Sequence, residues 1–260
     1  GETSPFQRNP LDVFMGNWSL DNSPMYLAWD LTSRIVSPYQ LNPMNYNPLR
    51  DLVEQQINFE RVRSCKQMDI YVAATNVRTG KIRVFANEEL SLDAVMASSC
   101  LPHMYQAVEI GDDAYWDGGF MGNPPLFPLF KQGGHTDVLL IQVNPVERNE
   151  LPHTAQEISE RLNEITFNST LLRELRAIDF VTRLIQEGRL DSDRYTRVYM
   201  HRIEATKDLS PFGASSKLNP QWEFIELLHD IGRQAAKKWA TENYDSIGKR
   251  STLDLGHEFN

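Results

Sequence analysis

An apolar run near the middle of the chain limits the possible folds more than any other sequence feature. Residues 136–143 are Thr-Asp-Val-Leu-Leu-Ile-Gln-Val, a short stretch dominated by aliphatic side chains. Such a run is typical of a fully buried strand in a parallel sheet, where helices cover both faces. Parallel strands need long crossover connections, which are usually helices. The run therefore predicts an α/β fold.

Signals for strands and helices alternate on the N-terminal side of this run. Residues 69–77 and 81–85 are rich in β-branched and aromatic side chains and flank a Gly-containing turn, which predicts a hairpin. Ser91 is a suitable N-cap for a helix of small apolar residues over 92–99. Residues 114–117 predict a short strand that two glycines end at once. This alternation favours layered α/β architecture.

The first sixty residues are dense in proline, asparagine and aromatic residues. Six X-Pro dipeptides occur there, and each biases the residue before proline away from helix, so only short helices fit. One is predicted over 25–37, with Ser23 as N-cap and Pro24 in the first helical position, and another over 48–57. The bulky apolar residues of this region suit an acyl-chain pocket, a membrane-facing lid or ordinary core packing.

Helices dominate beyond residue 152. Thr154 and Glu157 have the spacing of a capping box that opens a long amphipathic helix, or two helices with a break near Asn168. A strand is predicted over 195–204, and Asn219-Pro220 opens a last helix. We expect an irregular helical cap or lid over 1–67, an α/β core over 68–152, and a mainly helical C-terminal part of the same domain over 153–260.

Composition excludes several classes of function. The formal net charge of −9 argues against a nucleic-acid partner, which requires a concentrated basic face. No apolar run approaches the roughly 18 residues of a membrane span, and no leader opens the chain, so we expect a cytoplasmic protein that is at most peripheral to a membrane. Cys65 and Cys100 lack Cys-x-x-Cys spacing and are expected to be free thiols. The histidines show no zinc-ligand spacing and no dinucleotide-binding glycine motif is present, so no metal or cofactor is expected.

An Asp-Gly-Gly turn is the best candidate for chemistry. Asp117 ends the predicted strand 114–117, and the missing side chains of Gly118 and Gly119 let the backbone reverse and let other groups approach the acid. A carboxylate in a partly dry site suits a general base, although Asp-Gly is also a common turn dipeptide. Three neighbouring aromatic residues could wall the site or simply pack in the core: Tyr115, Trp116 and Phe120.

The segments around this turn resemble the patatin-like family of serine hydrolases. Ala97-Ser98-Ser99-Cys100-Leu101-Pro102 is similar to the family's Ala-Ser-x-x-x-Pro helix end, Asp117-Gly118-Gly119 to its Asp-Gly-Gly loop, and Asn123-Pro124-Pro125 to its Asn-x-Pro segment. Order and spacing match over 69–144. More loosely, the later helical regions resemble the C-terminal part of a bacterial branch of the family.

The resemblance implies both a fold and an activity. The implied fold is a three-layer α/β/α sheet, here incomplete at its N-terminal side, with a helical C-terminal extension. The implied activity is hydrolysis of lipid acyl esters by a Ser-Asp dyad without cofactor or metal. Asp117 would be the general base, with Gly118 and Gly119 supporting the turn or the oxyanion. The substrate would be a hydrophobic ester or a phospholipid, with peripheral membrane contact.

One departure from the family pattern is large. The sequence contains neither Gly-x-Ser-x-Gly nor a glycine-rich oxyanion loop. The nearest approach, around Ser215, lacks the second glycine and follows Asp117, whereas the family places its serine first. We therefore expect the nucleophile in a companion segment or chain, with this chain a fragment or a processed product of a lipid hydrolase. The alternative is a catalytically inactive scaffold that binds protein or lipid.

Overall fold

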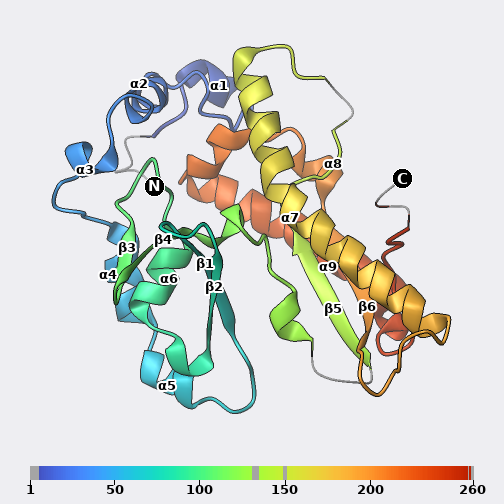
Figure 1. The fold of residues 1–260 in the computed structure, drawn as a ribbon. Coiled ribbons are helices and arrows are strands. Elements are labelled where there is room, and N and C mark those ends of the chain that lie inside the picture. The colour runs from blue at the N-terminus through green and yellow to red at the C-terminus, as the bar shows by residue number, and fades with distance from the viewer. Residues whose placement is uncertain (1–5, 131–134, 149–150, 257, 259–260) are drawn as a thin grey trace. The chain divides into compact units, whose positions relative to one another are not determined.

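The computed structural model describes residues 6–130, 135–148, 151–256 and 258, which form a mixture of helices and strands (Figure 1). The helices are α1 (Pro10–Phe14), α2 (Pro24–Ser33), α3 (Pro38–Leu41), α4 (Pro48–Gln56), α5 (Phe59–Ser64), α6 (Leu92–Ser98), α7 (Ala155–Gln186), α8 (Thr206–Leu209) and α9 (Trp222–Asn243). The strands are β1 (Tyr71–Asn76), β2 (Ile82–Ala86), β3 (Val108–Ile110), β4 (Asp113–Asp117), β5 (His135–Gln142) and β6 (Arg197–Glu204). The predicted α/β class with a helical C-terminal part is confirmed.

The chain divides into two compact units. The first unit contains the described residues within 1–29, 129–168 and 172–260. The second unit contains residues 30–128 together with 169–171. The proposed division of the sequence into cap, core and helical part remains a prediction.

A four-stranded antiparallel sheet, in the order β2-β1-β4-β3, forms the centre of the second unit. The hairpin predicted from the sequence is β1 and β2, which pair from Tyr71 with Ala86 to Thr75 with Ile82. The predicted strand over 114–117 is β4, whereas β3 was not predicted. Strand β1 is therefore central, with β2 on one side and β4 on the other.

Helix α6 packs closely on this sheet because its inward residues are small. Ser91 accepts a hydrogen bond from the backbone N–H of Ala94 at 3.1 Å, the N-cap predicted from the sequence. Phe85 and Tyr115 meet edge to face, with ring centroids 5.7 Å apart. The buried core cluster consists of Ala74, Phe85, Leu90, Ala94, Ala97 and Tyr115.

The proline pattern correctly predicts short helices near the N-terminus. Helices α2, α3 and α4 each begin at a proline. Proline has no backbone N–H, and at the first helical position this removes no hydrogen bond of the helix. The helix predicted over 25–37 ends at Ser33, and the chain starts the separate helix α3 at Pro38. Helix α5 follows α4 directly and was not predicted.

In the first unit, β5 and β6 form a two-stranded parallel sheet that runs from His135 opposite Arg197 to Gln142 opposite Glu204. The parallel pairing is as predicted, but the prediction of full burial is wrong. Val138 and Leu140 are buried, whereas Leu139 and Ile141, on the opposite face, are exposed, Ile141 to 71%. Alternate residues of a strand point to opposite faces of its sheet, and in the described part of the chain only the face that carries Val138 and Leu140 is well covered.

Helix α7 is continuous over 32 residues, so the alternative of two helices is wrong. Thr154 and Glu157 form the predicted capping box. Asn168 lies inside the helix and is buried, and its side-chain amide donates to the carbonyl of Pro145 at 2.8 Å. An asparagine with a partner outside the helix does not compete for the helix backbone, which explains the missing break.

A buried hydrogen-bond network ties the C-terminal segment to the parallel strands. The His201 ring is 3.0 Å from Asp137 through Nε2 and 2.9 Å from the Thr252 hydroxyl through Nδ1. The Asp137 carboxylate also accepts from the backbone N–H of Gly248 at 2.8 Å. Burial raises the pKa of Asp137, but the bonds from Gly248 and His201 together lower it below its ordinary value. The described C-terminal residues are therefore part of the packing of this unit.

Replacing Leu175 by alanine should destabilise the first unit. Leu175 in α7 is 1% exposed, so truncation leaves a cavity and should lower the free energy of unfolding by about 2–5 kcal/mol. Leu162 on the same helix is 59% exposed, and Leu162→Ala should change it by less than about 0.5 kcal/mol. Urea denaturation of both variants checks this, and equal effects would contradict the assigned buried face.

Candidate active site around Asp117

Asp117 lies at the end of β4, where its backbone is held from two sides. It pairs with Ala74 of the central strand β1. Its N–H donates to the carbonyl of Cys100 at 2.9 Å, and its carbonyl accepts from the Thr75 hydroxyl at 2.8 Å. Because a strand partner, a loop and a side chain all contact the backbone of this residue, the sheet fixes the position from which its carboxylate projects.

The carboxylate of Asp117 is half-buried. Its Oδ1 accepts a hydrogen bond from the backbone N–H of Gly119 at 2.7 Å. Burial raises the pKa of Asp117 above its ordinary value, and the bond from Gly119 opposes this rise only in part. A raised pKa makes the ionised carboxylate a better proton acceptor than an exposed aspartate, which is the property a general base needs.

Glycine is required at position 118 because of a close backbone approach. A Cβ built on Gly118 would lie 2.2 Å from the carbonyl oxygen of Ala73 and 2.5 Å from its carbonyl carbon. No side chain can occupy that space without moving β1. Gly118 therefore allows the turn, and Gly119 supports it through its bond to Asp117. An oxyanion role for either glycine remains a prediction.

Cys100 borders the site through its backbone and its thiol. The thiol donates to the carbonyl of Gln106 at 3.1 Å. Burial raises the pKa of Cys100 to about 11, more than a bond with the backbone of Val108 lowers it, and the nearby charge of Asp117 adds to the rise. The thiol is therefore protonated at neutral pH and is a weak nucleophile there.

Two positioning groups were missed in the sequence analysis. Thr75 lies in a strand-forming run, where a threonine is expected for its β-branched shape and gives no sign that its hydroxyl contacts Asp117. Cys100 belongs to the segment that precedes Pro102, and the residue types do not reveal that its carbonyl accepts from Asp117. The first contact depends on strand register and the second on the course of the loop after α6, and no short motif encodes either.

The aromatic residues beside Asp117 have different environments. Tyr115 belongs to the buried core cluster, so the plain packing interpretation holds for it. Trp116 is partly buried, and Phe120 remains 38% exposed. The side of the turn that carries Phe120 is therefore open to solvent, whereas the side that carries Tyr115 is closed.

Ser215, the nearest approach to a nucleophile motif, has a structural role. It is fully buried in the first unit. Its hydroxyl accepts from the backbone N–H of Leu20 at 3.0 Å and shares a hydrogen bond with the Ser19 hydroxyl at 3.0 Å. These bonds join the N-terminal segment to the turn that contains Ser215, and full burial leaves no access for a substrate.

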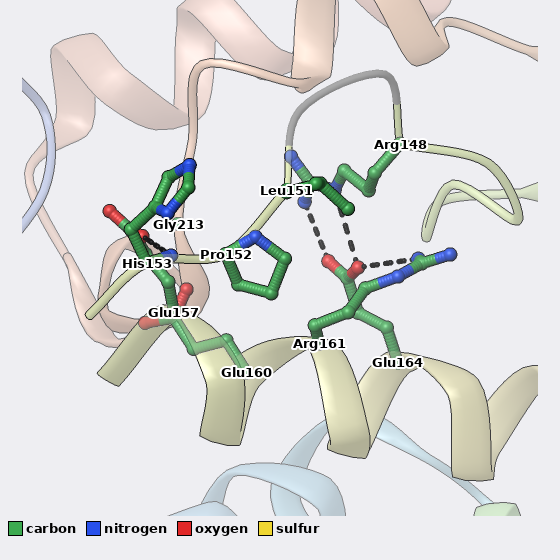
Figure 2. Close-up of a pocket in the computed structure, with 9 residues that line it drawn as sticks. All are labelled: Arg148, Leu151, Pro152, His153, Glu157, Glu160, Arg161, Glu164 and Gly213. Carbon is green, nitrogen blue, oxygen red and sulfur yellow. Dashed lines mark hydrogen bonds and ion pairs between the residues drawn. The ribbon is translucent and has the colours of Figure 1, made fainter. Parts of the chain in front are cut away.

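A cavity of about 640 Å³ lies in the first unit and does not include Asp117 (Figure 2). Charged side chains of its wall bind one another, since Glu164 accepts from Arg148 at 2.6 Å and from Arg161 at 3.1 Å. Arg148 and Arg161 also donate to backbone carbonyls of Ser210 and Val146, both at 3.0 Å. This arrangement fastens the segment after β5 to α7 and offers no paired nucleophile and base.

Within residues 6–130, 135–148, 151–256 and 258, no group of three or more His, Cys, Asp or Glu side chains is arranged to hold a metal ion. Over the same residues, no helix has the length and apolarity needed to cross a membrane.

Residues 10–130 match the family model described as patatin-like phospholipase. The matched range contains α1 to α6, the whole four-stranded sheet and the turn at Asp117. No curated protein matches the chain.

Gly118→Ala should destabilise the protein by about 1–3 kcal/mol or more, because the added methyl group overlaps the backbone of Ala73. Gly232→Ala is the matched control. Gly232 lies within α9 and has free space around its Cβ position, so alanine there should stabilise by roughly 0.5–1 kcal/mol. Thermal and urea unfolding measure both, and a tolerated Gly118→Ala would disprove the close approach.

The stability of Asp117→Asn relative to wild type should increase with pH. The raised pKa means that folding disfavours the ionised carboxylate, so wild type loses stability as the pH rises through the pKa of the folded state. Asparagine does not titrate and can still accept from Gly119. Unfolding curves at pH 4 and pH 7 should show the larger advantage of the variant at pH 7. Asp112→Asn, at an exposed turn position, serves as the control, and an advantage that falls with pH would contradict the burial argument.

Proposed function

We propose that this chain, whose residues 10–130 match the patatin-like phospholipase family of lipid hydrolases, hydrolyses lipid acyl esters with Asp117 as general base. The proposed nucleophile is a serine outside this chain, in a companion segment or subunit, since the sequence has no Gly-x-Ser-x-Gly. The substrate class is a phospholipid or another hydrophobic ester.

The observation that supports this proposal most directly is the environment of Asp117. Its carboxylate is half-buried, its pKa is raised, and its backbone bonds to Cys100 and Thr75. Oδ1 accepts from the Gly119 N–H, and among the residues that the structure describes no group donates a hydrogen bond to the other carboxylate oxygen, Oδ2. A base needs this combination of a fixed position, reduced hydration and an oxygen that can take a proton.

The chemistry then follows in two steps. As the serine hydroxyl attacks the ester carbonyl carbon, its proton moves to the carboxylate of Asp117, and the protonated acid then returns that proton to the departing alcohol. Water then attacks the acyl-serine while Asp117 accepts a proton from it, and Asp117 passes that proton to the serine oxygen as the fatty acid leaves, which restores both groups. A serine hydroxyl is a poor nucleophile without such a base.

Asp117→Asn should abolish turnover while preserving the fold. In the full-length protein or complex that carries the serine, we expect kcat to fall by about a hundredfold to ten-thousandfold, the usual contribution of a general base. Asparagine keeps the size and the bond to Gly119 but cannot accept a proton at neutral pH. Circular dichroism confirms folding, and Asp112→Asn should retain activity. Full activity of Asp117→Asn would disprove the role of Asp117.

A second candidate function is a catalytically inactive scaffold that binds protein or lipid. The absence of Gly-x-Ser-x-Gly favours it. A fluorophosphonate probe, which modifies activated serines, separates the two candidates. Labelling of a companion polypeptide that copurifies with this chain supports the hydrolase, whereas labelling of nothing in the intact protein supports the scaffold.

Two further properties belong to the same proposal. Peripheral contact with a membrane suits a hydrolase whose substrate resides in a lipid layer. A cytoplasmic location remains a prediction of the sequence.

A further inference from the structure

A tight turn after α3 presents apolar side chains to solvent. Met44 lies at its tip and is 90% exposed, and Tyr46 is 64% exposed. Leu41, at the end of α3, is also exposed. In Figure 1 this turn is part of the loop between α3 and α4. We call these three side chains, Leu41, Met44 and Tyr46, the turn surface. Bulky apolar groups gathered within a few residues and open to water are typical of an interaction site.

The turn has a defined conformation. The side-chain amide of Asn42 donates to the carbonyl of Tyr46 at 2.8 Å, and its oxygen accepts from the N–H of Tyr46 at 3.0 Å. Asn45 has a φ of 50°, a region that asparagine tolerates better than most residues, and its N–H donates to the carbonyl of Asn42 at 2.9 Å. Met44 is thus held on a closed turn. The backbone there loses little conformational entropy when the side chain binds a partner.

The lack of charged residues in this region indicates the kind of partner that binds it. Residues 35–49 contain no Asp, Glu, Lys or Arg in a chain of net charge −9. The arginines that flank this stretch are both paired, Arg34 with Asp30 at 3.1 Å and Arg50 with Asp93 at 2.7 Å. A neutral apolar surface on an acidic protein is complementary to an uncharged or zwitterionic partner and gains nothing from an anionic one.

The turn surface is connected to the site at Asp117 by hydrogen bonds within the same unit. The side chain of Gln106 donates to the carbonyl of Asn42 at 2.9 Å. The carbonyl of Gln106 accepts from the Cys100 thiol at 3.1 Å, and the carbonyl of Cys100 accepts from the N–H of Asp117 at 2.9 Å. A partner that binds the turn surface is therefore held next to the loop that positions the proposed base.

We propose that the turn surface docks onto a neutral lipid–water interface, such as a phosphatidylcholine layer. This inference rests on the proposed function, because a lipid hydrolase has to meet its substrate in such a layer. Leucine and methionine side chains enter the acyl region, and tyrosine prefers the level of the headgroups, where its ring is apolar and its hydroxyl remains hydrated. The proposed occupant is a lipid surface and not a protein.

Vesicle flotation tests the proposal with the full chain. The probe is a vesicle of ether-linked phosphatidylcholine, which has no ester to hydrolyse, so binding is measured independently of chemistry. Wild type should float with these vesicles. Met44→Gln and Tyr46→Gln should each weaken binding at least about tenfold, because each removes one buried apolar group. Phe180→Gln, on α7 and also more than half exposed, is the matched control and should bind like wild type.

Several results would overturn the proposal. The proposal is wrong if wild type fails to float, if both turn variants bind the vesicles as well as wild type does, or if binding requires phosphatidylserine. A wild-type dimer that Met44→Gln converts to a monomer would assign the surface to a second copy of the chain. Hydrolysis of a soluble short-chain ester by the intact protein is measured in parallel. Hydrolysis without vesicle binding would contradict only the docking surface, and vesicle binding without hydrolysis would contradict only the proposed function.

Discussion

The close approach between Gly118 and the backbone of Ala73 is the constraint on which the candidate site depends. Strand β4 ends against the central strand β1, and the chain reverses there with no room for a side chain. Because β1 is paired on both sides, it cannot shift to make space. The reversal places Asp117 at a fixed point of the sheet, and its bonds to Cys100, Thr75 and Gly119 depend on that position.

Local features of the fold could be predicted from the sequence because their causes are local. Proline positions predicted the short N-terminal helices, Ser91 predicted the start of α6, and the capping box at Thr154 predicted the start of α7. The burial of β5 was predicted wrongly because an apolar run does not reveal whether other elements cover both faces of the strand. The continuity of α7 at Asn168 depended on a partner distant in sequence, the carbonyl of Pro145.

The candidate site was likewise predictable only in the part that is adjacent in sequence. Asp117 and its two glycines are adjacent in sequence, so a motif could identify them. Thr75 and Cys100 contact Asp117 through the register of β1 and the course of the loop after α6. Which apolar side chains are exposed could be learned only from the structure. The exposed residues of β5 and those of the turn at Met44 also lie on different kinds of backbone. Ile141 lies on a strand that, among the described residues, has a partner on one side only, which suits another strand. In the turn at Met44, the Asn45 N–H and both backbone groups of Tyr46 are bonded within the turn.

The buried network at His201 has a consequence for the order of folding during synthesis. The second unit consists almost entirely of residues 30–128, so its sheet can form early on the ribosome. The first unit needs Gly248 and Thr252 to satisfy Asp137 and His201, which were synthesised long before. Until those residues emerge, the His201–Asp137 pair lacks two of its hydrogen-bond partners, the Thr252 hydroxyl and the Gly248 N–H. The first unit therefore completes its packing after the second unit, although residues 1–29 of the first unit are synthesised before the second unit.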